Sequence, residues 1–456
     1  MPGSMGEPLV VPREAHTLSR KLIDPDALKV LYRLHERHYV AYLVGGSVRD
    51  LLLGRRPKDF DIGTSAHPYE VKKLFRNCWI IGRRFRLAHV RFGTKTIEVA
   101  TFRRQVTAEE LAAEPMAVPD PPVDSAPGGA PGGAPDGTPE DRSAIDRSDA
   151  ERLVHRDNTF GTPEEDAFRR DFTINALFYD IGTFSIIDYA GGLEDLRAGL
   201  VRCIGDPNER FREDPVRMLR AVAMAARLDF RVDPPIDAAI ETHRDEIAKS
   251  APARLIEEFY KLLRTGSAER AFRMMAERRL LESMSPELQR HANDSLWRSL
   301  AALDVYRRRF EETPATLTNA ILLGSLLVPM NHPLRAPMPS KPSDDDPRKE
   351  PRISLGMLPL ARRDVEHLRH VLTLQKRLAD PTLSPRARQG LIHRGAFKDA
   401  LTWLEIHGGV PEVVEHWKGF IEAARVQEGT GTTEPEPTAR RRRRRRRRPF
   451  RPTPTQ

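Results

Sequence analysis

LVGGSVRD at residues 43–50 and KDFD at residues 58–61 are the stretches that decide the fold. The apolar residues before the glycines predict a short strand that ends at Gly45 and Gly46. Ser47 can then cap the helix that follows. A glycine pair between a strand and a helix lets a triphosphate approach the backbone amides and the positive end of the helix. The first stretch therefore predicts a phosphate-binding turn.

Asp59 and Asp61 lie in a predicted strand over residues 59–62, so both carboxylates point to one face and Phe60 points into the core. Two such carboxylates repel each other unless a cation lies between them. Mg²⁺ prefers carboxylate oxygens together with substrate phosphate, and two such ions can activate a hydroxyl and stabilise leaving pyrophosphate. A solvated loop is the alternative interpretation, but the glycine turn about 14 residues upstream favours a phosphate-transfer site.

Glu98 is the candidate for a third acidic group. It lies in a predicted strand over residues 96–102, which should pair as a hairpin with residues 89–92. Ile97 and Val99 face the opposite side of that strand. Glu98 would share the face of the two aspartates if their strands are neighbours, and it is otherwise an ordinary solvated strand residue.

Length and composition indicate the number of domains and the cellular compartment. A chain of 456 residues predicts two or three domains. It has no run of 18 apolar residues, and residues 1–20 lack an apolar signal core, so we expect no membrane span and a cytoplasmic protein. Cys78 and Cys203 fit a reducing compartment, and their spacing predicts buried thiols rather than a zinc site.

The net charge of +9 is concentrated in one unbroken run of nine arginines, so the rest of the chain is close to neutral. Such an arm binds a polyanion by displacing counterions, without reading its sequence. A solubility tail is the alternative. We interpret the run as an RNA-binding arm made of Arg440, Arg441, Arg442, Arg443, Arg444, Arg445, Arg446, Arg447 and Arg448.

Composition and periodicity predict an α+β protein, with a small head (a mixed sheet with helices) followed by an all-helical body. The expected segments are a disordered N-terminus (1–20), a head (21–205) with a disordered Pro/Gly-rich insert (about 109–150), a helical neck (206–270), a helical body (271–426) and a disordered tail (427–456). Predicted helices cover residues 25–38, 48–53, 69–75, 171–178, 216–228, 235–248, 253–263, 268–279, 296–310 and 317–327, and a loop covers 333–351.

Further motifs follow the first in a recognisable order: RRDFTINA at 169–176, DYAGGLEDL at 188–196, REDPVRMLRA at 212–221 and a helical segment at 253–258. Together they resemble the class II nucleotidyltransferases of the polymerase-beta-like superfamily, which hold bacterial poly(A) polymerases and tRNA CCA-adding enzymes. The resemblance spans about residues 22–263. It implies a polymerase-beta-like head that transfers a nucleotide from a triphosphate to a hydroxyl acceptor.

The resemblance implies a role for each matching residue. Asp59, Asp61 and Glu98 would be catalytic, and the two aspartates would hold two Mg²⁺ ions, with Mn²⁺ as an alternative. The implied nucleotide-binding residues are Gly45, Gly46, Ser47, Arg49, Arg170, Asp171, Asn175, Asp214, Arg217 and Arg220. Asp171 and Asn175, one turn apart on a predicted helix, would meet the ribose and triphosphate region.

Asp214 and Arg217 would present the edge that selects the incoming base, because an aspartate and an arginine at i, i+3 offer acceptors and donors side by side. A plain salt bridge is the alternative interpretation of such helix pairs. Asp50 is expected to be structural and to pair with Arg49 or a backbone amide.

Three segments resemble the poly(A) polymerase version of the family: residues 74–78, 80–90 and 156–161. We therefore predict template-independent addition of AMP from ATP to RNA 3′ ends. The alternatives are a tRNA CCA-adding enzyme and, in another class, a non-catalytic RNA-binding protein. Expected partners are ATP and RNA 3′ ends, with RNA degradation machinery on family grounds alone, and a monomer is the default.

Overall fold

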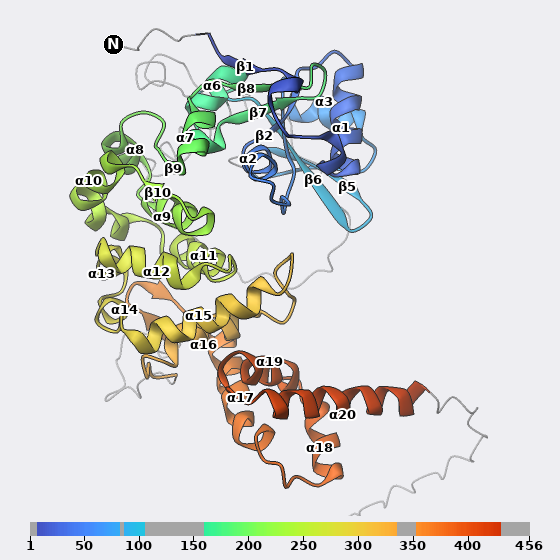
Figure 1. Ribbon diagram of the computed structural model, residues 1–456, viewed down its shortest axis with the longest axis vertical. Helices are drawn as coiled ribbons and strands as arrows, with labels where there is room; N and C mark the ends of the chain where they lie inside the picture. The colour runs from blue at the N-terminus through green and yellow to red at the C-terminus, as the bar shows by residue number, and fades with distance from the viewer. Residues whose placement is uncertain (1–6, 83–85, 105–158, 335–352, 430–456) are drawn as a thin grey trace, which may run out of the picture. The chain divides into compact units, whose positions relative to one another are not determined.

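The computed structural model describes residues 7–82, 86–104, 159–334 and 353–429 (Figure 1). The chain forms two compact units, residues 1–368 and 369–456. Within the described ranges, no helix is both long and apolar enough to cross a bilayer. The predicted insert (109–150), the greater part of the 333–351 loop and the arginine run lie outside the described residues.

An eight-stranded mixed sheet forms the head, as predicted. In spatial order its strands are β1 (Leu9–Val11), β8 (Ile186–Asp188), β7 (Leu177–Asp180), β2 (Ala41–Val44), β3 (Asp61–Thr64), β6 (Lys95–Thr101), β5 (Leu87–Phe92) and β4 (Cys78–Ile81). Neighbours are antiparallel except β3 and β6, which are parallel. The predicted hairpin is confirmed, because Phe92 on β5 pairs with Lys95 on β6.

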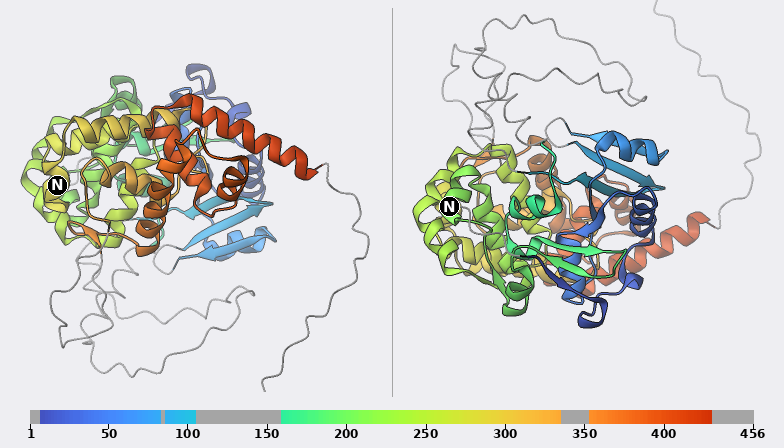
Figure 2. Two further views of the ribbon diagram at one scale, coloured as in Figure 1. Left: turned by 90° about the horizontal axis from the view of Figure 1, so that it is seen from below. Right: turned by 90° about the horizontal axis from the view of Figure 1, so that it is seen from above.

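Helices α1 (Pro25–Glu36) and α3 (Pro68–Leu74) pack on one face of the sheet and lie beside its blue strands in Figure 2. Apolar residues at helical spacing on α1 supply the buried side, and the Asp24 side chain accepts from the first backbone amides of that helix. Strand residues such as Ile97 and Val99 bury their side chains against this layer. Alternation along each strand therefore sends their neighbours, including Glu98, to the other face.

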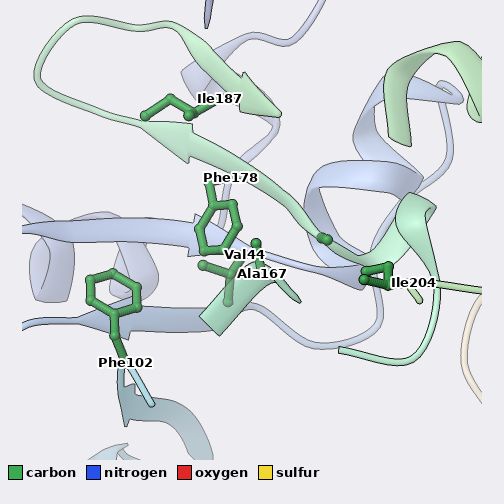
Figure 3. Close-up of a cluster of buried hydrophobic side chains, with 7 residues drawn as sticks. Val44, Phe102, Ala167, Phe178, Ile187 and Ile204 are labelled. Carbon is green, nitrogen blue, oxygen red and sulfur yellow. The ribbon is translucent and has the colours of Figure 1, made fainter. Parts of the chain in front are cut away.

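That other face is filled only over part of the sheet. Near β2, β7 and β8 it carries a cluster of buried apolar side chains, drawn in Figure 3: Val44, Phe102, Ala167, Ala176, Phe178, Ile187 and Ile204. Ala167 comes from α6 (Pro163–Phe168), a short helix that begins with a capping box formed by Thr162 and Glu165. The cluster fixes the segment around α6 against the centre of the sheet.

Helices dominate the chain after the last strand of the large sheet, β8. They are α7 (Gly192–Ala198), α8 (Pro207–Glu213), α9 (Val216–Leu228), α10 (Pro234–His243), α11 (Pro252–Leu263), α12 (Ala268–Glu277), α13 (Leu280–Met284), α14 (Pro286–Arg290), α15 (Asp294–Arg308), α16 (Asn319–Leu327), α17 (Arg362–Leu378), α18 (Pro385–Ile392), α19 (Phe397–His407) and α20 (Pro411–Gly429). Very short strands also occur here: β9 (Leu200–Val201), β10 (Arg231–Val232), β11 (Ser354–Leu355) and β12 (Leu358–Pro359).

Two local predictions about the N-terminal part of the head were wrong. Residues 9–11, within a stretch expected to be disordered, form the edge strand β1, because β8 offers them a backbone partner. The helix expected at 48–53 begins earlier, as α2 (Gly46–Leu52), and its N-cap is Gly45 rather than Ser47. The Gly45 amide donates to the Leu177 carbonyl on β7, which holds the turn at a positive φ of 68°.

Two further element predictions failed near the expected site. The predicted helix over residues 171–178 is a 3₁₀ turn, Thr173–Asn175, followed by β7. The apolar residues at the start of β7 fill the gap between β2 and β8, and this pairing overrides local helix preference. The strand expected at 59–62 starts at Asp61, and Phe60 is only half-buried instead of lying in the core.

Candidate functional site

The carboxylates of Asp61 and Glu98 lie side by side. Strands β3 and β6 are parallel, with Ile62 opposite Val99, so the residues one position earlier in each strand share a face. This confirms that the strand of Glu98 neighbours that of the aspartates. Asp59 stands just before β3, outside the strand and exposed. His89 on β5 lies on the other side of Glu98, with its Nε2 3.7 Å from Glu98 Oε1.

The electrostatics of this group are repulsive. Loss of hydration, followed by the negative charges of Glu98 and Asp59, raises the pKa of Asp61 to about 6, while Arg170 acts in the opposite direction. Among the described residues, no three His, Cys, Asp or Glu side chains converge in a ready-made metal-binding cluster. The donors nevertheless fit a divalent cation, because hard carboxylate oxygens of uncompensated charge are the ligands that Mg²⁺ prefers.

Asp61→Asn is expected to raise the melting temperature of the metal-free protein near neutral pH by a small amount, of the order of 2 °C. A carboxyl whose folded pKa is about 6, against an ordinary value of 3.8, destabilises the fold increasingly as pH rises through this window. Asparagine removes that penalty, and the exposure of Asp61 keeps the gain small. Thermal unfolding in chelator at about pH 8 and about pH 4 checks this, since the gain should disappear at the lower pH. An equal gain at both values would contradict it.

The glycine turn closely approaches an arginine. A Cβ at Gly45 would lie 2.9 Å from Arg170 Nη1, so a side chain there would displace the guanidinium. Arg170 donates to Asp166 through Nε (3.1 Å) and Nη2 (2.8 Å), and its Nη1 donates to the Asn175 carbonyl (3.1 Å). Arg170 is thereby fixed beside the turn and close enough to Asp61 to limit the rise of its pKa.

Two residues expected to bind nucleotide are enclosed by the protein. Ser47 is buried and its Oγ donates to the Val44 carbonyl (2.9 Å). Arg49 is only 4% exposed; its Nε donates to Asp50 (2.9 Å) and its Nη1 to Asn175 Oδ1 (2.5 Å). Asp50 therefore pairs with Arg49, as predicted. Both side chains are engaged in holding the turn.

Asp171 and Asn175 come together although no helix carries them. Asn175 Nδ2 donates to Asp171 Oδ1 (3.3 Å), across the 3₁₀ turn. The other oxygen of Asp171 accepts from Arg220 Nη1 on α9 (3.5 Å). Arg220 also lies 4.0 Å from Glu258 on α11. Three predicted site residues therefore form one contact group that joins the turn before β7 to α9.

Asp214 and Arg217 are near each other but have other partners. Asp214 stands in extended conformation between α8 and α9, not on a helix, and Arg254 holds its two oxygens at 2.9 and 2.7 Å. Burial alone would raise the pKa of Asp214, but the hydrogen bond and charge of Arg254 outweigh it and lower the pKa. Arg217 Nη1 donates to Glu213 Oε2 (2.8 Å) and to the Arg210 carbonyl (2.9 Å).

Sequence reasoning missed Asp166 and Arg210. Asp166 is a buried carboxylate that accepts from Arg169 and Arg170, and its i, i+3 and i, i+4 spacing to these arginines is a signal that could have identified it. Arg210 on α8 is also buried, and its Nη2 donates to the carbonyl of Arg169 (2.7 Å). This contact joins positions 41 residues apart, and no local pattern reveals it.

Comparisons with known proteins agree with this geometry. The family model described as "Poly A polymerase head domain" matches residues 41–202. "Probable RNA and SrmB- binding site of polymerase A" matches residues 229–291, and "Polymerase A arginine-rich C-terminus" matches residues 354–450.

Curated relatives come from both branches of the group. The chain is 46% identical over 286 residues to poly(A) polymerase I of Salmonella typhi, covering 63% of this chain and 55% of that protein. It is 33% identical over 258 residues to the CCA-adding enzyme of Lactobacillus helveticus (strain DPC 4571), covering 57% and 54%. The chain thus spans about half the length of the curated relatives it matches.

A solved structure shares the fold. The crystal structure of the Bacillus stearothermophilus CCA-adding enzyme in complex with CTP aligns with a TM-score of 0.54 at 24% identity, covering 88% of this chain and 83% of that one. The family matches, the relatives and this fold confirm the resemblance that the sequence motifs indicated. The chain thus matches the head-domain model of poly(A) polymerases over residues 41–202 and is similar to both poly(A) polymerases and CCA-adding enzymes, the two groups of the class II nucleotidyltransferases.

Proposed function

We propose that the chain adds AMP from ATP to RNA 3′ ends without a template, and so synthesises poly(A) tails. The observation that carries this choice is the higher identity to a poly(A) polymerase, 46% over 286 residues, than to a CCA-adding enzyme, 33% over 258 residues. The match of residues 354–450 to an arginine-rich polymerase C-terminus supports the same choice.

In the proposed reaction, the 3′ hydroxyl oxygen of the RNA forms a bond to the α-phosphorus of ATP. The bond from that phosphorus to the bridging oxygen of pyrophosphate breaks, and the hydroxyl proton passes to solvent. This reaction does not require a protein side chain to bond to the phosphate, so the side chains of the site would act by positioning and charge neutralisation. This role of Asp61 and Glu98 is supported by their position on one face, near Arg170.

A pair of divalent cations, Mg²⁺ in our proposal, would be held by Asp59 and Asp61 with Glu98 beside them. Bound there, the ions would supply charge stabilisation at the attacking and leaving oxygens. The raised pKa of Asp61 supports this assignment, because part of the rise, after loss of hydration, comes from the negative charges of Glu98 and Asp59, and a bound cation would relieve that repulsion.

The triphosphate would lie along the turn at Gly45 and Gly46, with Arg170 facing the phosphates. Asp171, Asn175 and Arg220, which already contact one another, would meet the ribose. We assign Ser47 and Arg49 to positioning, since the protein's own groups engage their side chains.

Asp214 and Arg217 would form the protein edge that selects the base in place of a template. Arg254 fixes the carboxylate of Asp214, and Glu213 fixes the guanidinium of Arg217. Side chains that are already fixed lose less conformational entropy when the base binds than mobile ones do, so these two polar groups are suited to recognising a base.

Primer extension tests the proposal. The purified chain is given an unstructured RNA and each of the four triphosphates separately. A long ladder with ATP alone is the expected result. A requirement for CTP on a tRNA that lacks its 3′ end, with arrest after a few additions, would instead identify a CCA-adding enzyme. RNA binding without any incorporation would identify a non-catalytic RNA-binding protein.

Arg217→Ala is expected to reduce the preference for ATP over the other triphosphates by at least about ten-fold, because a hydrogen-bonding base edge discriminates by this order or more. The kcat/KM ratio of ATP to each competitor measures this preference. Arg212→Ala, an exposed arginine on α8, is the matched control and should leave the ratio unchanged. An unchanged ratio in Arg217→Ala would move base selection to other residues.

Deletion of Arg440–Arg448 is expected to weaken RNA binding and to flatten its dependence on salt. Each lost phosphate contact removes roughly 0.7 from the slope of log K against log salt for single strands. Replacing the nine arginines by lysines keeps the charge and should keep most of the slope. A deletion variant with the wild-type slope would show that the run does not contact RNA.

The relatives' names point to RNA and nucleoside triphosphates as the ligands of this family. We extend this to ATP and RNA 3′ ends as partners of the chain, and we propose a cytoplasmic monomer whose products are substrates for RNA degradation machinery. Gel filtration of the purified chain tests the monomer.

A further inference from the structure

The face of the sheet that carries Asp61 and Glu98 continues across two more strands. His89 on β5 pairs with Glu98, and Trp79 on β4 pairs with His89. Directly paired residues point to the same face, so Asp61, Glu98, His89 and Trp79 form one row across four strands. With neighbouring strands about 4.8 Å apart, Trp79 is roughly 14 Å from Asp61.

Large side chains on the part of this face formed by β4 are exposed. On the opposite face, Cys78, Ala88 and Val90 are buried against the layer of α3. On the face of the row, Trp79 is 41% exposed and Ile81 is 51% exposed. Large apolar side chains that are exposed next to each other on one strand indicate an interaction site rather than chance exposure.

The chemistry of the open face combines an aromatic ring with positive charge. Arg91 on β5 lies two residues beyond His89 on the same face, and it is exposed. Its Nε donates to the Gly93 carbonyl (2.9 Å), which anchors the guanidinium near the end of β5 that leads into the hairpin turn. An exposed aromatic ring beside a cation is the combination that binds single-stranded nucleic acid, through base stacking and backbone attraction.

We propose that Trp79, Ile81 and Arg91, together called the Trp79 platform, stack the bases of the RNA acceptor a few nucleotides upstream of its 3′ hydroxyl. This inference rests on the proposed function. RNA is favoured over a protein partner because the platform continues the row of Asp61 and Glu98, where the 3′ hydroxyl must lie. Stacking also tolerates any base, as an enzyme that extends many RNAs requires.

Steady-state kinetics with acceptors of two lengths test the platform. Trp79→Ala is expected to raise the KM for an unstructured RNA of about twelve nucleotides roughly five-fold or more, since one stacked base contributes that order of affinity. The KM for ATP and the kcat should change less than about two-fold. A dinucleotide acceptor is too short to reach Trp79, so its KM should be unaffected. Trp79→Phe, which keeps a ring, should restore most of the affinity for the longer RNA.

Tyr69→Ala is the matched control, because Tyr69 on α3 is exposed to a similar degree, 38%, on the other side of the sheet. It should leave every constant unchanged. Equal KM values for the long RNA in wild type and Trp79→Ala would overturn the platform. An equal rise of the KM for the dinucleotide in Trp79→Ala would also overturn it. A change in oligomeric state on substitution of Trp79 would also overturn it and assign the surface to a second copy of the chain. If wild type fails to extend RNA with ATP, the proposed function fails first, and that result is distinct from all of these.

Discussion

Asp61→Ala is expected to lower the rate of AMP incorporation by at least about a thousand-fold, because several kcal/mol of charge stabilisation correspond to that factor. Asp59→Ala should have an effect of similar size. Asp61 is the first residue of β3 and lies beside Glu98; loss of hydration and then the charges of Glu98 and Asp59 raise its pKa to about 6, and a cation would neutralise those charges. Removing either aspartate removes a proposed metal ligand while the neck and body are unchanged, so RNA binding should persist.

Single-turnover incorporation with saturating RNA and ATP measures this loss, and fluorescence anisotropy with labelled RNA measures binding. Glu36→Ala, an exposed carboxylate at the end of α1 on the other side of the sheet, is the control and should keep the wild-type rate. A variant of Asp59 or Asp61 that keeps about a tenth of the wild-type rate would refute the assignment of the metal ligands.

Asp166→Ala is expected to lower the free energy of unfolding by about 2–3 kcal/mol, because it removes a buried carboxylate and leaves the half-buried guanidinium groups of Arg169 and Arg170 without their counter-ion. The carboxylate is 3% exposed and accepts from Arg169, Arg170 and the backbone amide of Arg103. Burial alone would raise the pKa of Asp166, but Arg170 and Arg169 outweigh it and lower the pKa. A lowered pKa stabilises the fold above the unfolded value, so this contribution is lost only as pH falls through the folded pKa.

Urea unfolding at neutral pH measures the change. Glu415→Ala, which breaks the exposed i, i+3 pair with Lys418, is the control and should cost less than about 1 kcal/mol. Equal unfolding free energies for Asp166→Ala and the control would show that the arginines find other partners. Because Arg170 loses its anchor beside Gly45, activity measured at a temperature where Asp166→Ala is folded should also fall.

Local patterns predicted the parts of the fold that local interactions decide. The helix predicted at 216–228 coincides with α9, because its apolar residues repeat at helical spacing and its end requires no distant partner. Alternation along each strand likewise predicted that Asp61 and Glu98 would share a face if their strands were neighbours, and β3 and β6 are neighbours. The helix and the alternation depend on periodicity and backbone geometry, whereas the pairing of the two strands is a long-range contact that the sequence left open.

The features that were predicted wrongly depend on contacts between residues that are distant in the chain. Residues 171–178 have helical spacing, yet β7 forms because β2 and β8 provide backbone partners on both sides. Arg49 looked available for a triphosphate, but its partner Asn175 is 126 residues away in the chain. In the same way, Asp214 and Arg217 were expected to act as a helix pair, whereas Arg254 and Glu213 hold them separately.

Pyrophosphate release tests whether this chain extends RNA with AMP through the carboxylates of β3 and β6. The amount released per RNA 3′ end is measured with ATP alone and with CTP alone, for wild type and Asp61→Ala in parallel. We expect many pyrophosphates per RNA end with ATP, few with CTP, and none above background for Asp61→Ala. Release that stops after about one turnover per end, or that continues in Asp61→Ala, would contradict this expectation.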